Sequence, residues 1–81
     1  MIYFITDHKE HPTMVKIGFT RNRPEARLKA LQTGSPVSLH LMGWIPAPTE
    51  AEREIHDVLR DYRTHGEWFC WSKYVATTCA F

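Results

Sequence analysis

The stretch Met14-Val-Lys-Ile-Gly-Phe-Thr20 alternates large apolar residues with polar or small ones, the two-residue period of a strand with one buried face. Val15, Ile17 and Phe19 form its apolar side. Met1-Ile-Tyr-Phe-Ile5 is similarly rich in the β-branched and aromatic residues that strands favour. Because a polar segment separates these two stretches, we predict that they pair as an antiparallel hairpin.

Two helices and a third strand are expected after this hairpin. Pro24 to Leu31 starts with a proline, which suits a first helical turn, and Gly34 is expected to end the helix in a left-handed conformation. Val37 to Ile45 is expected to be the third strand. A second helix is predicted to begin at Thr49 and to end before Gly66. The predicted fold class is therefore α+β, a small three-stranded antiparallel sheet flanked by helices.

The second helix is predicted to have a buried face and a polar margin. Its apolar residues recur at helical spacing and are Ile55, Val58, Leu59 and Tyr62. Glu52, His56 and Arg63 fall along one strip beside that face. Glu52 also lies three residues after Thr49, the register of a capping box, which is a purely structural explanation for this carboxylate.

Length and composition indicate one domain spanning residues 1–81. The chain is 43% hydrophobic and 12% aromatic, enough for a small core. Its longest apolar run, Met1 to Ile5, is far too short to cross a bilayer, and no charged leader with a cleavage site is visible. A soluble cytoplasmic protein with no membrane partner is therefore expected. The aromatic run from Glu67 to Trp71 is expected to cover the sheet, and a brief helix is expected after Ser72.

Charge is distributed unevenly along the chain. Residues 1–44 contain six basic and three acidic side chains, a net charge of +3, whereas residues 45–81 contain four and six, a net charge of −2. Five basic residues fall in one short stretch: Lys16, Arg21, Arg23, Arg27 and Lys29. A solvated helix face is one explanation. The other is a phosphate-binding surface followed by an acidic element that holds a metal ion.

Several short motifs occur in an order that resembles the GIY-YIG endonuclease superfamily, and its compact phage and bacterial branch in particular. Tyr3 stands where the GIY tripeptide ends, and Lys16-Ile-Gly18 stands where YIG is expected. The remaining matches are Thr20, Arg27, the pattern Glu52-Arg-Glu-Ile-His56, Arg63, and Gly66-Glu-Trp-Phe69. The resemblance covers roughly residues 1–70.

The resemblance implies hydrolysis of DNA phosphodiester bonds with one divalent metal, Mg²⁺ or Mn²⁺, held by Glu52. Arg27 would then stabilise charge on the phosphoryl group, and Tyr3 or Lys16 would orient or deprotonate the attacking water. The proposed catalytic residues are Tyr3, Lys16, Arg27 and Glu52, and the proposed DNA contacts are Arg21, Arg23, Lys29 and His56. The setting implied is the cytoplasm of a bacterial or phage-infected cell, with a homodimer or a partner protein supplying specificity.

A second interpretation is a catalytically weak or inactive module that binds nucleic acid or protein on the same scaffold. Three departures from the family pattern favour it: Lys16 replaces a tyrosine, Leu31 replaces a helical histidine, and a late asparagine has no clear counterpart. Gly18 is expected to be structural, permitting a close approach of backbone or substrate. His8 and His11 do not by themselves make a four-ligand zinc site.

Overall fold

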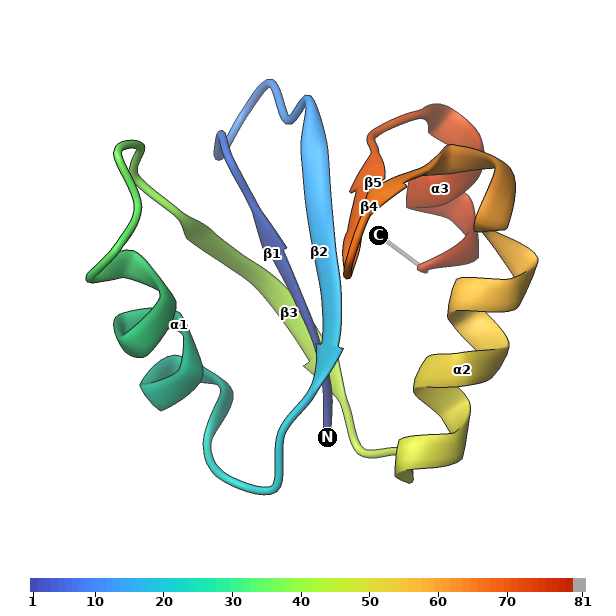
Figure 1. The fold of residues 1–81 in the computed structure, drawn as a ribbon, viewed down its shortest axis with the longest axis horizontal. Helices are drawn as coiled ribbons and strands as arrows, with labels where there is room; N and C mark the ends of the chain where they lie inside the picture. The colour runs from blue at the N-terminus through green and yellow to red at the C-terminus, as the bar shows by residue number, and fades with distance from the viewer. Residues whose placement is uncertain (80–81) are drawn as a thin grey trace.

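An antiparallel β-sheet organises the molecule (Figure 1). The computed structural model describes residues 1–79. Its elements are β1 (Ile2–Thr6), β2 (Met14–Phe19), α1 (Pro24–Gln32), β3 (His40–Ile45), α2 (Thr49–Val58), a 3₁₀ turn (Arg60–Tyr62), β4 (Arg63–His65), β5 (Trp68–Cys70) and α3 (Lys73–Thr78). The strands lie in the order β3-β1-β2-β5-β4.

The hairpin predicted from the N-terminal stretches is confirmed. β1 and β2 pair antiparallel, with Tyr3 opposite Gly18 and Ile5 opposite Lys16. The Asp7 carboxylate closes the intervening loop by accepting hydrogen bonds from the backbone N–H groups of Thr13 and Met14, at 2.9 and 3.2 Å. All five residues of β1 are buried, because this strand has a neighbour on each side and a helical layer over each face.

Helices cover both faces of the sheet, with α1 on one side and α2 and α3 on the other (Figure 1). The larger core lies on the α2 and α3 side, where Leu59 and Val75 pack against apolar side chains of β1, β2 and β5. The buried sheet residues of this cluster are Ile2, Phe4, Val15, Ile17 and Phe69. Side chains alternate between the faces of a strand, so Tyr3 is directed to the other side, toward α1.

The sheet has five strands, so the prediction of three was too few. The predicted second helix was too long, because α2 ends at Val58 and Arg63 begins β4 instead of continuing the helical strip. A reversal at Gly66 (φ 58°) then folds β5 back against β4. Consequently the aromatic run that was expected to cover the sheet supplies one of its strands, β5.

Two other boundaries and the exposure of one residue also differ from the predictions. Gly34 is not left-handed, and α1 ends at Gln32. The side-chain amide of Gln32 bonds Val37 O and Leu39 N at 2.9 and 2.6 Å, which keeps the start of the predicted third strand out of the sheet. Val58 is 56% exposed and does not belong to the buried face of α2.

Glu52 is not part of a capping box. The N-cap of α2 is Pro48, and no side chain caps this helix end. Thr49 is therefore already inside the helix, and Pro48 has no backbone N–H for a glutamate to accept from. The structural explanation for Glu52 is removed, which leaves its carboxylate available for other contacts.

The expected terminal helix is present as α3. Its N-cap is Ser72, whose hydroxyl oxygen accepts a hydrogen bond from Val75 N at 3.1 Å. Among residues 1–79, no helix combines the length and apolar character that crossing a bilayer requires.

Replacing Gly66 with alanine is expected to destabilise the protein by about 1 kcal/mol, because a side chain disfavours the left-handed conformation that this reversal requires. Urea denaturation measures the loss. Gly34→Ala is the matched control, since that glycine is not left-handed and no atom lies within 4 Å of the added methyl group. Equal stability of the two variants would contradict the prediction.

Candidate functional site

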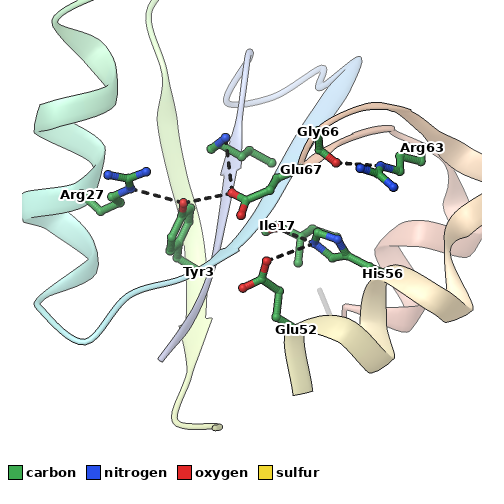
Figure 2. Close-up of polar contacts among 9 residues, drawn as sticks. Tyr3, Ile17, Arg27, Glu52, His56, Arg63, Gly66 and Glu67 are labelled. Carbon is green, nitrogen blue, oxygen red and sulfur yellow. Dashed lines mark hydrogen bonds and ion pairs between the residues drawn. The ribbon is translucent and has the colours of Figure 1, made fainter. Parts of the chain in front are cut away.

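A chain of polar contacts runs from α1 to the start of β5 through the buried Tyr3 (Figure 2). The Arg27 Nε–H donates to the Tyr3 hydroxyl oxygen at 3.4 Å, and the Tyr3 hydroxyl donates to Glu67 Oε1 at 3.5 Å. Lys16 Nζ lies 3.4 Å from the same Glu67 oxygen. Three predicted site residues therefore belong to one chain of contacts, in which Tyr3 joins Arg27 to Glu67 and Glu67 joins Tyr3 to Lys16.

Gly18 makes room for this arrangement. A Cβ atom at residue 18 would lie 2.4 Å from the Tyr3 hydroxyl oxygen and 2.7 Å from Glu67 Oε1. Both distances are shorter than real Cβ contacts. Gly18 thus permits a close approach, but the groups that approach it are two side chains of the site and not the backbone or substrate that was expected.

Glu52 and His56 lie together on α2, as their spacing predicts. His56 Nε2 is 3.8 Å from Glu52 Oε1, and it donates to the backbone carbonyl oxygen of Ile17 at 2.8 Å. The carbonyl can only accept, so the proton resides on Nε2. The ring also packs edge-on against Phe69, with 4.8 Å between centroids. These contacts fix the imidazole beside the carboxylate.

The Glu67 carboxylate acts on the ionisation of Glu52. Burial raises the pKa of Glu52, and repulsion and hydrogen bonding from Glu67 raise it further, while His56 and Lys16 oppose the rise. Glu67 therefore connects the two halves of the site, contacting Tyr3 and Lys16 on one side and acting on Glu52 on the other.

Tyr3 is unsuited to act as a phenolate. Burial raises the pKa of its hydroxyl above the ordinary value of 10.0, and the carboxylates of Glu67 and Glu52 add to the rise, although Arg27 opposes it. The hydroxyl therefore stays protonated at neutral pH. It acts as a hydrogen-bond donor and acceptor, the role that its contacts with Arg27 and Glu67 already show.

The chemistry of the two carboxylates fits a hard divalent cation. Mg²⁺ needs only one or two carboxylates, because water and substrate oxygens complete its coordination. Glu52 and Glu67 supply oxygen donors whose mutual repulsion a cation would relieve. Within residues 1–79 no group of three or more histidine, cysteine or acidic side chains is arranged to hold a metal. The residues fit a partly hydrated magnesium ion and do not fit an all-protein cage.

The hollows of the surface lie on either side of the site. One of about 810 Å³ follows α2 and is lined by Glu52, His56 and Arg63, among others. A smaller one of about 220 Å³ is lined by Arg27 and by residues of the loop before α1. Glu52 and Arg27 therefore line different hollows, with the Tyr3 and Glu67 contact between their elements.

The other predicted DNA contacts are placed on the surface. Arg21 and Arg23 lie in the loop before α1 and Lys29 lies on α1, and all three are exposed. Arg23 pairs with Glu25 at 3.8 Å, an exposed pair of little energetic weight. These three side chains are thus accessible to a ligand, and they lie on the α1 side of the molecule with Arg27.

A family model described as the T5orf172 domain matches residues 1–80. The chain belongs to the T5orf172 domain family. No curated protein and no solved structure matches it. The description of the family names no reaction, so the residues of this T5orf172 domain are the only guide to its chemistry.

Sequence reasoning missed the importance of Glu67 in this T5orf172 domain. The motif Gly66-Glu-Trp-Phe69 is part of the resemblance to the GIY-YIG endonucleases, but the resemblance gave Glu67 no role. The signal that identifies Glu67 is three-dimensional, namely its contacts with Tyr3 and Lys16 from more than 45 residues away in the chain.

Gly18→Ala is expected to lower the free energy of unfolding by about 1–3 kcal/mol, because the new methyl group overlaps the buried Tyr3 ring. Chemical denaturation measures the change, again with Gly34→Ala as the control. A Gly18→Ala variant as stable as that control would show that the site tolerates a side chain at residue 18.

Glu52→Gln is expected to stabilise the metal-free protein near neutral pH. A raised pKa means that the folded protein binds the Glu52 proton more tightly than the unfolded chain does, so this group's contribution falls as pH rises above its ordinary value of 4.5. Below pH 4.5 both the folded protein and the unfolded chain carry the Glu52 proton, so the stabilisation by Glu52→Gln should vanish. Denaturation curves across this pH range, recorded with a chelator, test the sign. A variant less stable than wild type at neutral pH contradicts it.

Proposed function

We propose that this T5orf172 domain is a metal-dependent endonuclease that hydrolyses DNA phosphodiester bonds, related to the GIY-YIG endonucleases. The observation that carries the proposal is a chain of contacts in which Tyr3 joins Arg27 to Glu67 and Lys16 pairs with the same Glu67 oxygen. Glu52 is close enough to that carboxylate for its pKa to be raised by it. These side chains come from β1, β2, α1, α2 and the turn between β4 and β5, so their proximity is not explained by neighbouring positions in the chain.

Each residue has a role that its surroundings support. The guanidinium of Arg27 is exposed and binds the scissile phosphate, where it offsets the charge that builds up during attack. The Tyr3 hydroxyl orients the attacking water instead of deprotonating it, since its pKa is raised. Lys16 places a positive charge beside the Glu67 carboxylate, which the Tyr3 hydroxyl also contacts.

Glu52 is the proposed ligand of Mg²⁺ or Mn²⁺, and His56 lies beside its carboxylate, with Nε2 3.8 Å from Glu52 Oε1. When bound, the metal ion would stabilise the charge on the leaving 3′ oxygen. Glu52 suits this task because it is only partly exposed and its repulsion from Glu67 favours a nearby cation.

DNA is the proposed partner, and the exposed cations of the α1 side are its proposed backbone contacts. Arg21, Arg23 and Lys29 would bind flanking phosphates without reading sequence. So few contacts predict weak binding that falls steeply with salt. A second protomer or a partner protein would strengthen the binding, and the bacterial or phage-infected cytoplasm is the proposed setting.

The second candidate is a module that binds nucleic acid and cuts it weakly or not at all. Two observations favour it over an efficient nuclease. Lys16 is paired with Glu67, and the Tyr3 hydroxyl has a raised pKa, so neither group is prepared to remove a proton from water. Binding without cleavage in the next experiment would select this candidate.

Wild-type protein is expected to cut plasmid or branched DNA when Mg²⁺ or Mn²⁺ is present. Glu52→Gln and Arg27→Ala should each lower the cleavage rate by about 10²-fold or more, as loss of a transition-state contact does. Glu10→Gln and Lys9→Ala, in the exposed loop between β1 and β2, are the matched controls and should cut normally. Metal-dependent cutting that survives Glu52→Gln would refute the assignment of the metal ligand.

Metal binding can be measured without cleavage. Mg²⁺ or Mn²⁺ should raise the melting temperature of wild type and of Glu10→Gln in proportion to saturation, because a ligand of the folded state stabilises it. Glu52→Gln should lose most of this rise. An equal rise in all three proteins would place the bound metal elsewhere.

A further inference from the structure

We propose that Glu67 is a positioning residue of this site, whose carboxylate sets the direction of the Tyr3 hydroxyl and the place of the Lys16 ammonium. The inference rests on the proposed function, and it adds a residue to which neither the family match nor sequence reasoning gave a role. Its basis is that one oxygen, Glu67 Oε1, contacts both partners, at 3.5 Å from the Tyr3 hydroxyl and 3.4 Å from Lys16 Nζ.

The backbone places Glu67 precisely enough for such a role. The carbonyl oxygen of Glu67 accepts a hydrogen bond from Ile17 N at 2.9 Å, which fixes it next to β2. The preceding Gly66 is left-handed, and its carbonyl oxygen accepts from Arg63 Nε at 2.7 Å. The side chain of Glu67 then occupies the space above Gly18. The first two contacts hold the backbone of residues 66 and 67 beside β2, so that the Glu67 side chain reaches the space above Gly18.

The direction of the Tyr3 hydroxyl follows from its two neighbours. Arg27 can only donate, so the tyrosine oxygen accepts from it, and the carboxylate of Glu67 accepts the hydroxyl proton. With the proton committed to Glu67, the second lone pair of the tyrosine oxygen remains as an acceptor for a water molecule. Without Glu67 the hydroxyl could rotate, and the orientation of the attacking water would be lost.

The same carboxylate holds the positive charge of Lys16 at the site. The Lys16 side chain is only 14% exposed and its ammonium also lies 5.6 Å from the centroid of the Trp68 ring. A flexible lysine without Glu67 would turn toward solvent. A partly exposed ion pair contributes little to folding, up to about 1 kcal/mol, so removal of Glu67 should affect catalysis more than stability.

Glu67→Gln is the decisive variant, because glutamine keeps the shape and can still accept the Tyr3 proton but cannot pair with Lys16. We expect kcat for plasmid cleavage to fall at least about 10-fold while KM changes less than about twofold, the pattern of a contact that matters in the transition state. Glu67→Ala loses both contacts, so its kcat should fall further. Glu10→Gln is the control and should match wild type.

A triple variant compared with a double variant shows whether Glu67 acts through its partners. If it positions Tyr3 and Lys16, then Glu67→Ala combined with Tyr3→Phe and Lys16→Met should lose no more rate than Tyr3→Phe with Lys16→Met alone, because the groups that it orients are already gone. The inference would be overturned if Glu67→Ala lowered the rate of the double variant by the same factor as it lowers the rate of wild type. It would also be overturned if every loss of rate followed a loss of folded protein, measured by urea denaturation of the same samples.

A structural readout separates this inference from the proposed function. In metal-free protein without DNA, Glu67→Ala should shift the NMR resonances of the Tyr3 ring and of the Lys16 side chain, whereas Glu10→Gln should not. Unchanged resonances, or a Glu67→Ala variant that cuts as fast as an active wild type, overturn this inference alone. A wild type that never cuts DNA overturns the proposed function, and the role of Glu67 in catalysis falls with it.

Discussion

The Glu67 carboxylate and the Tyr3 hydroxyl share a space that exists only because residue 18 has no side chain. That space lies between strands that are far apart in the sequence, since β5 pairs with β2 and β1 pairs with β2 on its other side. If it were filled, Tyr3 could not keep its contacts with Arg27 and Glu67 while remaining buried. The arrangement of the candidate site therefore depends on a single close approach in the middle of the sheet.

This close approach has an electrostatic consequence. Glu67 neutralises Lys16 but repels Glu52, and burial adds to the cost of charging Glu52. A protein selected only for stability would avoid two such carboxylates facing each other, because like charges in a partly buried site disfavour folding. Their persistence together is a reason to look for a ligand that benefits from both, and perturbed carboxylates of this kind gather at functional sites.

The surroundings of Tyr3 and Lys16 also change which chemistry is reasonable. The family resemblance offers either residue as the group that deprotonates water, yet a buried neutral phenol and a paired ammonium are better suited to orienting water and phosphate. Belonging to the T5orf172 domain family does not settle this question, because a shared fold accommodates different activities and the site must be judged by its residues. The proposed nuclease and the proposed binding module differ in whether Tyr3 and Lys16 assist the attack of water on a phosphate. Both would bind nucleic acid through the same exposed cations.

The sequence by itself determined the local elements: the hairpin of β1 and β2, helix α1, the presence of strand β3, the start of α2 and the short α3. The signals for these elements lie within a few neighbouring residues. Apolar and polar residues alternate in β2, Pro24 marks the start of α1, and the hydroxyl of Ser72 caps α3. It also placed Glu52 and His56 on one helix. Only the tertiary structure decided that α2 stops at Val58, that residues 63–70 complete the sheet, and that Glu67 meets Tyr3 and Lys16. Strands as short as β4 and β5 have no periodicity of their own. β5 forms because β2 provides a partner edge, and β4 pairs in turn with β5, which no local pattern in their own residues reveals.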